Sequence, residues 1–109
     1  MTKNNYKDYA KIFKALSDDT RLKIVEMISC EEMCACDILD FFHISQSTLS
    51  YHMKILSESN IVNSRKDGSW VKYKLNKDMI SQIKYIFEEL TVGNDSCICS
   101  NVKNKNCNN

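Results

Sequence analysis

The dipeptide Asp67-Gly68 constrains the fold most, because it separates two runs that favour extended structure, residues 61–66 and 69–75. In the second run apolar and polar residues alternate, which is typical of a strand with one buried face. An Asp-Gly pair between two such runs favours a two-residue turn, since glycine readily adopts the positive φ angle that tight hairpins need. The sequence therefore predicts a β-hairpin whose core-facing side chains are Val71, Tyr73 and Leu75.

Helical periodicity precedes and follows this hairpin. Apolar residues recur every three or four positions, which is the spacing of one buried helix face. The predicted helices are 6–16, 18–30, 34–42, 45–59 and 77–90. The turn His43-Ile44 joins the third helix to the fourth, which predicts a helix-turn-helix, and the basic hairpin that follows is typical of a wing. We therefore expect a mainly α (α+β) winged helix-turn-helix fold.

Two buried helix faces follow from the same spacing. In the second helix the residues expected to face the core are Leu22, Val25 and Ile28. In the fourth helix they are Leu49, Met53 and Leu56. Trp70 is assigned to packing on the hairpin, because aromatic residues often pack across strands.

The polar side of the fourth helix and the hairpin carry side chains suited to DNA. Glutamine pairs with adenine, hydroxyl groups bond to bases or phosphates, and lysine and arginine neutralise phosphate. Residues 45–78 include six basic and three acidic side chains, whereas the whole chain has a net charge of only +1. The alternative to DNA binding is that this polar helix face is exposed to solvent and binds no ligand. The candidate DNA contacts from this pattern are Gln46, Ser47, Ser50, Tyr51, Lys54, Arg65, Lys66 and Lys72.

The last helix has a wide apolar surface, which favours packing against a second copy of the chain in a twofold homodimer. The 109 residues predict one domain, residues 1–92, followed by a flexible tail, residues 93–109, that carries Cys97, Cys99 and Cys107. No segment has the length and apolar character of a signal peptide or a membrane span. We therefore expect a soluble, cytoplasmic protein without a membrane partner.

Six cysteines in a chain without a signal peptide indicate metal or redox chemistry rather than a disulfide framework. Cys34 and Cys36 lie directly before the predicted DNA-contacting helix, and thiolates select soft or borderline metals and metalloids. Two small buried hydrophobic residues and a redox-switched thiol pair are the alternatives. With two glycines in all, the chain has no phosphate-binding glycine loop, and it has no hydrolytic constellation. Enzyme activity is not expected.

Four motifs in order resemble the ArsR/SmtB family of winged-helix regulators, over residues 6–90. Asp19 stands where that family often has proline, and an acidic residue also suits the first turn of a helix. The resemblance adds Ser45, Thr48 and His52 to the candidate DNA contacts. The motifs are Leu16-Ser17-Asp18-Asp19-Thr20-Arg21-Leu22, Cys34-Ala35-Cys36-Asp37, Ser45-Gln46-Ser47-Thr48-Leu49-Ser50-Tyr51-His52-Met53 and Arg65-Lys66-Asp67-Gly68-Ser69-Trp70.

The resemblance implies a repressor whose dimer binds double-stranded operator DNA and dissociates when an inducer binds Cys34 and Cys36. No resident cofactor is expected, and trivalent arsenic or antimony is the preferred inducer. These elements favour three thiolates, and Leu39 occupies the position of the third cysteine in many arsenite-responsive members. Cys30, Cys97, Cys99 or an exogenous thiol remains the candidate third ligand, with a tail cysteine favoured.

The same resemblance also indicates which other metal ions could act as inducers. Cadmium or lead sensing with four thiolates, from Cys34, Cys36, Cys97 and Cys99, is the alternative, although related sensors carry N-terminal cysteines and residues 1–29 have none. The zinc and nickel sensors use histidines on the last helix, and this chain has no histidine after His52. Within a regular helix, residues two apart lie about 200° apart, so a shared ion is expected to distort the helix at Cys34 and Cys36.

Overall fold

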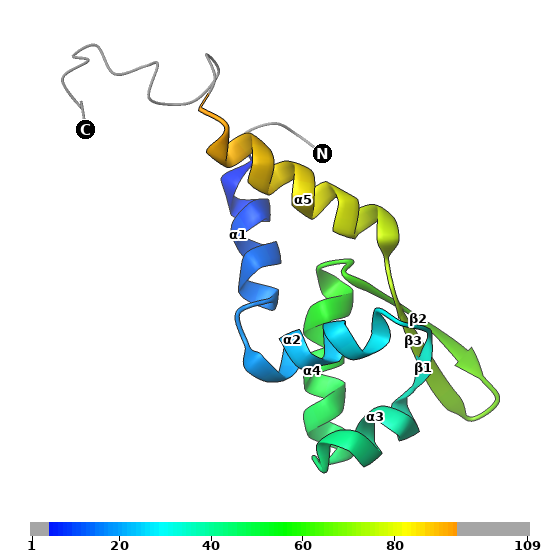
Figure 1. The fold of residues 1–109 in the computed structure, drawn as a ribbon. Coiled ribbons are helices and arrows are strands. Elements are labelled where there is room, and N and C mark those ends of the chain that lie inside the picture. Colours follow the sequence, from blue (N-terminus) through cyan, green and yellow to red (C-terminus); the bar gives the residue numbers. More distant parts are fainter. Residues whose placement is uncertain (1–4, 94–109) are drawn as a thin grey trace.

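Five helices and three short strands make up the described part of the chain, residues 5–93 of a computed structural model (Figure 1). The predicted winged helix-turn-helix fold with five helices is confirmed. The elements in chain order are α1 (Tyr6–Ala15), α2 (Asp19–Ile28), β1 (Met33–Cys34), α3 (Ala35–Phe42), α4 (Gln46–Glu58), β2 (Val62–Asp67), β3 (Trp70–Leu75) and α5 (Lys77–Thr91).

Polar side chains fix where the helices begin. The carboxylate of Asp18 accepts a hydrogen bond from the backbone N–H of Arg21 at 3.1 Å, and the hydroxyl of Ser45 accepts one from Thr48 at 3.1 Å. Such caps satisfy N–H groups that have no partner within the helix. Helix α3 ends at Phe42, and the residue that follows, His43, has a φ of 54° in the left-handed region. This residue turns the chain sharply between α3 and α4, the pair that forms the helix-turn-helix.

The sheet differs from the prediction in two respects. The hairpin strands pair from Val62 opposite Leu75 to Asp67 opposite Trp70, so the turn is Gly68-Ser69 rather than Asp67-Gly68. Gly68 adopts the positive φ of 67° that the turn requires. The sheet also has a third strand, β1, which pairs antiparallel with β3 and makes the strand order β1-β3-β2. At two residues β1 is too short to leave a periodic signal in the sequence.

The core lies where the helices meet the base of the sheet. Ile24, Ile38, Leu56 and Ile61 are fully inaccessible to solvent, and Ile12 of α1 and Ile86 of α5 extend the same cluster. The predicted apolar face of α4 is confirmed, since Leu49, Met53 and Leu56 are all buried. None of the helices in residues 5–93 is long and apolar enough to cross a membrane.

The buried face of α2 was predicted only in part. Ile28 is buried as expected, but Leu22 is 52% exposed, and the neighbouring Arg21 is 8% exposed. An arginine tolerates burial when its N–H groups have acceptors. The guanidinium of Arg21 has two, the carbonyl of Ala15 at 2.7 Å and the ring of His52 at 3.1 Å. These acceptors let α2 turn Arg21 inward and Leu22 outward.

Truncation of Leu56 to alanine is expected to lower the free energy of unfolding by about 2–5 kcal/mol, because it leaves a cavity in a closely packed core. Leu22→Ala removes the same atoms from an exposed site and should change this free energy by no more than about 0.5 kcal/mol. Urea denaturation followed by circular dichroism measures both. Equal losses in the two variants would contradict the burial described for α2 and α4.

Candidate DNA interface and thiol site

Helix α4 presents its polar residues to solvent at its N-terminal end. The hydroxyl of Ser45 caps the helix and also donates to the hydroxyl of Thr48 at 2.8 Å, so these two residues support one another. Base contacts in helix-turn-helix proteins come mainly from the N-terminal residues of the second helix. The candidate DNA contacts exposed on this helix and its cap are Ser45, Gln46, Ser47, Thr48, Ser50, Tyr51 and Lys54.

His52 differs from the other candidates on α4 because its side chain is only 12% exposed. Its Nδ1 lies 3.1 Å from Nη1 of the buried Arg21 and 3.9 Å from a carboxylate oxygen of Asp18. Since a guanidinium only donates, Nδ1 accepts this hydrogen bond and the ring proton of the neutral histidine is on Nε2. His52 thus ties α4 to α2, and through Arg21 to the last carbonyl of α1.

Asp18 belongs to the same group of side chains. The backbone N–H of Arg21 donates to this carboxylate, which holds the pKa of Asp18 below its ordinary value. The positive charge of the Arg21 guanidinium acts in the same direction. The carboxylate therefore stays charged at the position where it caps α2.

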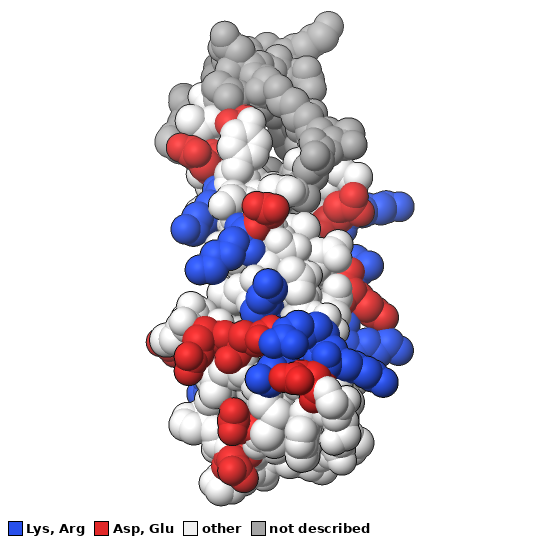
Figure 2. Space-filling model, turned by 90° about the vertical axis from the view of Figure 1, so that its right-hand side faces the viewer, with Lys and Arg blue, Asp and Glu red and all other residues white. Residues whose placement is uncertain are grey.

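Two basic side chains of the wing, Arg65 and Lys72, are paired with carboxylates. Arg65 on β2 donates two hydrogen bonds to Glu32, from Nε at 2.8 Å and from Nη2 at 2.7 Å. Lys72 on β3 lies 3.2 Å from a carboxylate oxygen of Asp67. Lys66 is exposed at the end of the same hairpin. On the side toward which the wing projects, basic and acidic side chains consequently lie together (Figure 2).

The contact between Arg65 and Glu32 also changes the acidity of both groups. The two hydrogen bonds from Arg65 hold the pKa of the Glu32 carboxyl below its ordinary value, and the charges of Arg65, Lys72 and Lys74 act in the same direction. The same hydrogen bonds raise the pKa of Arg65. Glu32 was not among the predicted site residues, because an acidic residue in a loop gives no sequence signal of its partner.

The two cysteines predicted to bind an inducer come together. The sulfur atoms of Cys34 and Cys36 are joined as a disulfide, with their Cα atoms 5.2 Å apart. Cys34 precedes α3 in extended conformation and serves as its N-cap, accepting a hydrogen bond from the N–H of Cys36 at 3.2 Å. The prediction that Cys34 lies within the helix is wrong, so the separation of about 200° expected in a regular helix does not apply to these two side chains. The cause is the change from strand to helix between these residues.

Cys34 is at the same time a residue of the wing sheet. It pairs with Lys72 of β3, and Lys72 pairs on its other side with Arg65 of β2. The thiol pair therefore lies at a junction, with the wing on one side and the first helix of the helix-turn-helix on the other. Sequence spacing alone did not reveal this connection, since it depends on the pairing of β1 with β3.

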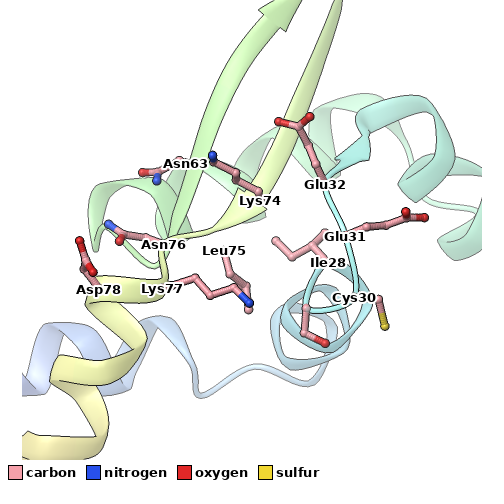
Figure 3. A pocket seen from close by; sticks show the side chains of 11 residues that line it. Ile28, Cys30, Glu31, Glu32, Asn63, Lys74, Leu75, Asn76, Lys77 and Asp78 are labelled. Atoms are coloured by element: carbon pink, nitrogen blue, oxygen red, sulfur yellow. The ribbon is translucent and has the colours of Figure 1, made fainter.

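No third cysteine is grouped with Cys34 and Cys36 in the described part of the chain. Cys30 is exposed on the segment between α2 and β1. That segment forms one side of a cleft of about 420 Å³, with Lys74 and Lys77 on the other side (Figure 3). In residues 5–93, no three histidine, cysteine or carboxylate side chains are grouped so that they could hold a metal ion. Cys97, Cys99 and Cys107 lie outside the described residues.

Comparison with known proteins shows which family this chain resembles. Residues 18–64 match the family model described as "Bacterial regulatory protein, arsR family". The chain is 43% identical over 103 residues to an arsenical resistance operon repressor of Staphylococcus aureus, which covers 94% of this chain and 99% of the relative. It is also 42% identical over 84 residues to a homologue of the cadmium resistance transcriptional regulatory protein CadC from the same species, covering 76% of this chain and 69% of the relative.

The fold is also similar to that of solved structures. HlyU from Vibrio cholerae superposes with a TM-score of 0.67 at 25% identity, covering 84% of this chain and all of that one. The high identity over nearly the full length of the staphylococcal repressor, together with this fold, establishes the relationship. The chain belongs to the ArsR family of transcriptional repressors and is related to the arsenical and cadmium resistance regulators.

Proposed function

We propose that this repressor binds operator DNA as a homodimer and releases it when arsenite or antimonite binds Cys34 and Cys36. The observation that carries the proposal is the meeting of the two sulfur atoms at the start of α3. In the reduced state this pair offers two adjacent thiolates, which soft metalloids prefer. The kinship with arsenical resistance repressors favours this class of inducer over others.

The DNA-binding surface in this proposal combines α4 with the wing. The exposed residues at the start of α4 enter the major groove, and the hairpin residues Arg65, Lys66 and Lys72 follow the phosphates. His52 contributes by fixing the position of α4 against α2, and its side chain is only 12% exposed. A twofold dimer would place two such surfaces about one helical turn of DNA, or 34 Å, apart.

The position of the thiols suggests how the inducer acts. A metalloid held by both sulfurs enters between the N-cap of α3 and its first turn, and α3 leads directly into α4 through the turn at His43. A shift of α4 relative to its counterpart in the dimer changes the half-site spacing. A tenfold loss of affinity needs only about 1.4 kcal/mol of coupling between the two sites.

The dimer is inferred from apolar side chains that the single chain leaves exposed. Phe87 is 60% exposed and Tyr85 62% exposed on α5, although the same helix buries Ile86 in the core. Helix α5 therefore carries large apolar side chains outside the stripe that it buries, which favours a second protein surface. The exposed apolar side chains on α1 and α5 are Tyr6, Tyr85, Phe87 and Leu90.

Two alternative inducing signals, a divalent metal ion and oxidation, are each supported by one observation. The kinship with a cadmium resistance regulator supports cadmium or lead as the inducer, held by Cys34, Cys36 and two tail cysteines. The disulfide between Cys34 and Cys36 supports an oxidation-switched repressor, in which the pair reports the redox state. The order of inducer potency and the thiolate-to-metal absorption bands distinguish cadmium from arsenite. Release by peroxide under metal-free conditions would favour the redox switch.

Replacement of Cys34 or Cys36 by serine should leave operator binding within about twofold and abolish release by arsenite, since the cysteines bind the inducer and not the DNA. Fluorescence anisotropy of a duplex from upstream of the gene measures both, with the reduced protein at fixed salt. Cys107→Ser, at a cysteine assigned neither to the inducer nor to DNA, is the control and should respond like the wild type. Loss of DNA binding in the uninduced Cys34 or Cys36 variant would contradict the assignment.

A tail cysteine is expected to supply the third thiolate. Cys97→Ser or Cys99→Ser should therefore weaken the response to arsenite at least about tenfold without changing DNA binding, because trivalent arsenic loses one of three sulfur ligands. Arsenite titrations in the same anisotropy assay measure this, with Cys107→Ser as the control. The segment that carries these cysteines is included in the similarity to the staphylococcal repressor, because a match over 103 of the 109 residues must extend beyond residue 93. An unchanged response in a variant lacking Cys97, Cys99 and Cys107 would assign the third ligand to Cys30 or an exogenous thiol.

Phe87→Glu is expected to convert the dimer to a monomer at micromolar concentration, because it places a charge in an apolar interface. Tyr51→Glu provides the control, since Tyr51 is also 60% exposed but lies on α4. Sedimentation equilibrium measures the two association constants. The assignment of α5 to the interface would be wrong if Phe87→Glu remained a dimer, or if Tyr51→Glu dissociated equally.

A further inference from the structure

Arg65 is predicted to bind phosphate, yet in the protein alone its guanidinium is occupied by Glu32. The two hydrogen bonds, at 2.7 and 2.8 Å, form a bidentate contact that uses both carboxylate oxygens. A phosphate group accepts the same pair of donors in the same geometry. The edge of Arg65 formed by Nε and Nη2 can therefore hold one of these two anions at a time.

The sheet brings these residues together although they are 33 positions apart in sequence. Arg65 on β2 and Cys34 on β1 both pair with Lys72 of the central strand, so they share one row across the sheet. Glu32 lies two residues before Cys34 and reaches Arg65 across β3. Glu32 is thus placed by the segment that leads into the thiol site, while Arg65 is placed by the wing.

The pair is open to exchange with an external anion. The side chain of Arg65 is 53% exposed and that of Glu32 is 26% exposed, so solvent reaches both. Exposed ion pairs generally contribute little to stability, although the bidentate geometry makes this one stronger than most. A phosphate offers Arg65 the same charge-assisted, bidentate contact, so it can take the place of the carboxylate.

We propose that Glu32 competes with operator phosphate for Arg65 and so sets the affinity of the wing for DNA. In the free protein Arg65 is held by Glu32, and on the operator it transfers to a phosphate and leaves Glu32 unpaired. Because Glu32 immediately precedes the strand that carries Cys34, this competitor belongs to the part of the protein that the inducer is proposed to perturb. The inference rests on DNA binding by the wing, as proposed above, and does not depend on which inducer acts.

Substitution of Glu32 by glutamine tests the competition. The variant is expected to bind the operator about two- to fivefold more tightly, the effect expected from an exposed ion pair. The dependence of log affinity on log salt should become steeper by up to about one unit, because Glu32 no longer takes up a cation when Arg65 leaves it. Fluorescence anisotropy at four or five salt concentrations measures both.

Further variants distinguish competition for Arg65 from a general effect of the change in net charge. Glu31→Gln makes the same change of net charge at the neighbouring residue, which is exposed and outside the Arg65 contact, so it gives the general electrostatic effect. In an Arg65→Gln background, Glu32→Gln should have no more effect than Glu31→Gln. A carboxyl titration by NMR checks the contact without DNA, since the pKa of Glu32 should rise toward its ordinary value in Arg65→Gln.

The outcomes are distinct. Tighter binding by Glu32→Gln than by Glu31→Gln, lost in the Arg65→Gln background, supports the competition. Weaker binding by Glu32→Gln would show that Glu32 orients Arg65 for DNA, and an effect that persists without Arg65 would show that the pair is incidental. Either result overturns the competition while the wild type still binds the operator. A wild-type protein with no salt-dependent operator binding would instead overturn the DNA-binding role of the wing.

Discussion

The antiparallel pairing of β1 with β3 is the constraint on which the arrangement of the site depends. It includes only two residue pairs, Met33 with Tyr73 and Cys34 with Lys72. Through them the segment before α3 becomes part of the wing sheet, with Cys34 extended at the end of the strand and Cys36 in the first turn of the helix. A change of conformation at this point brings the two sulfurs together and connects them to the wing and, through α3, to α4.

A second constraint holds the helices in place. Arg21 is buried between α1, α2 and α4, where it donates to the carbonyl of Ala15 and to the ring of His52. A buried guanidinium is costly unless its donors are satisfied, and its removal would leave acceptors without partners. The recognition helix α4 is thereby tied to the end of α1, one of the two helices proposed to meet the second chain. An inducer that moves α4 must work against this contact.

Much of the fold followed from local patterns. The five helices, their order and the hairpin were predicted within a few residues, because caps such as Ser45 and the apolar spacing of Leu49, Met53 and Leu56 act over one or two turns. The turn in the hairpin was displaced by one residue, from Asp67-Gly68 to Gly68-Ser69, since strand register is set by pairing and not by the turn residues alone. The inward position of Arg21 was missed because its acceptors come from residues distant in sequence.

The sequence by itself determined which chemistry the chain carries: a thiol pair at Cys34 and Cys36, a polar recognition helix and a basic hairpin. These depend on residue types and short spacings, which local periodicity and side-chain chemistry are enough to interpret. Only the tertiary structure decided which of these groups meet. The disulfide at the β1–α3 junction, the burial of His52 against Arg21 and the hold of Glu32 on Arg65 all require a short strand to pair with a distant one, or helices to pack. Such contacts are fixed by the fold as a whole, because each depends on segments that are distant in sequence and carry no information about one another.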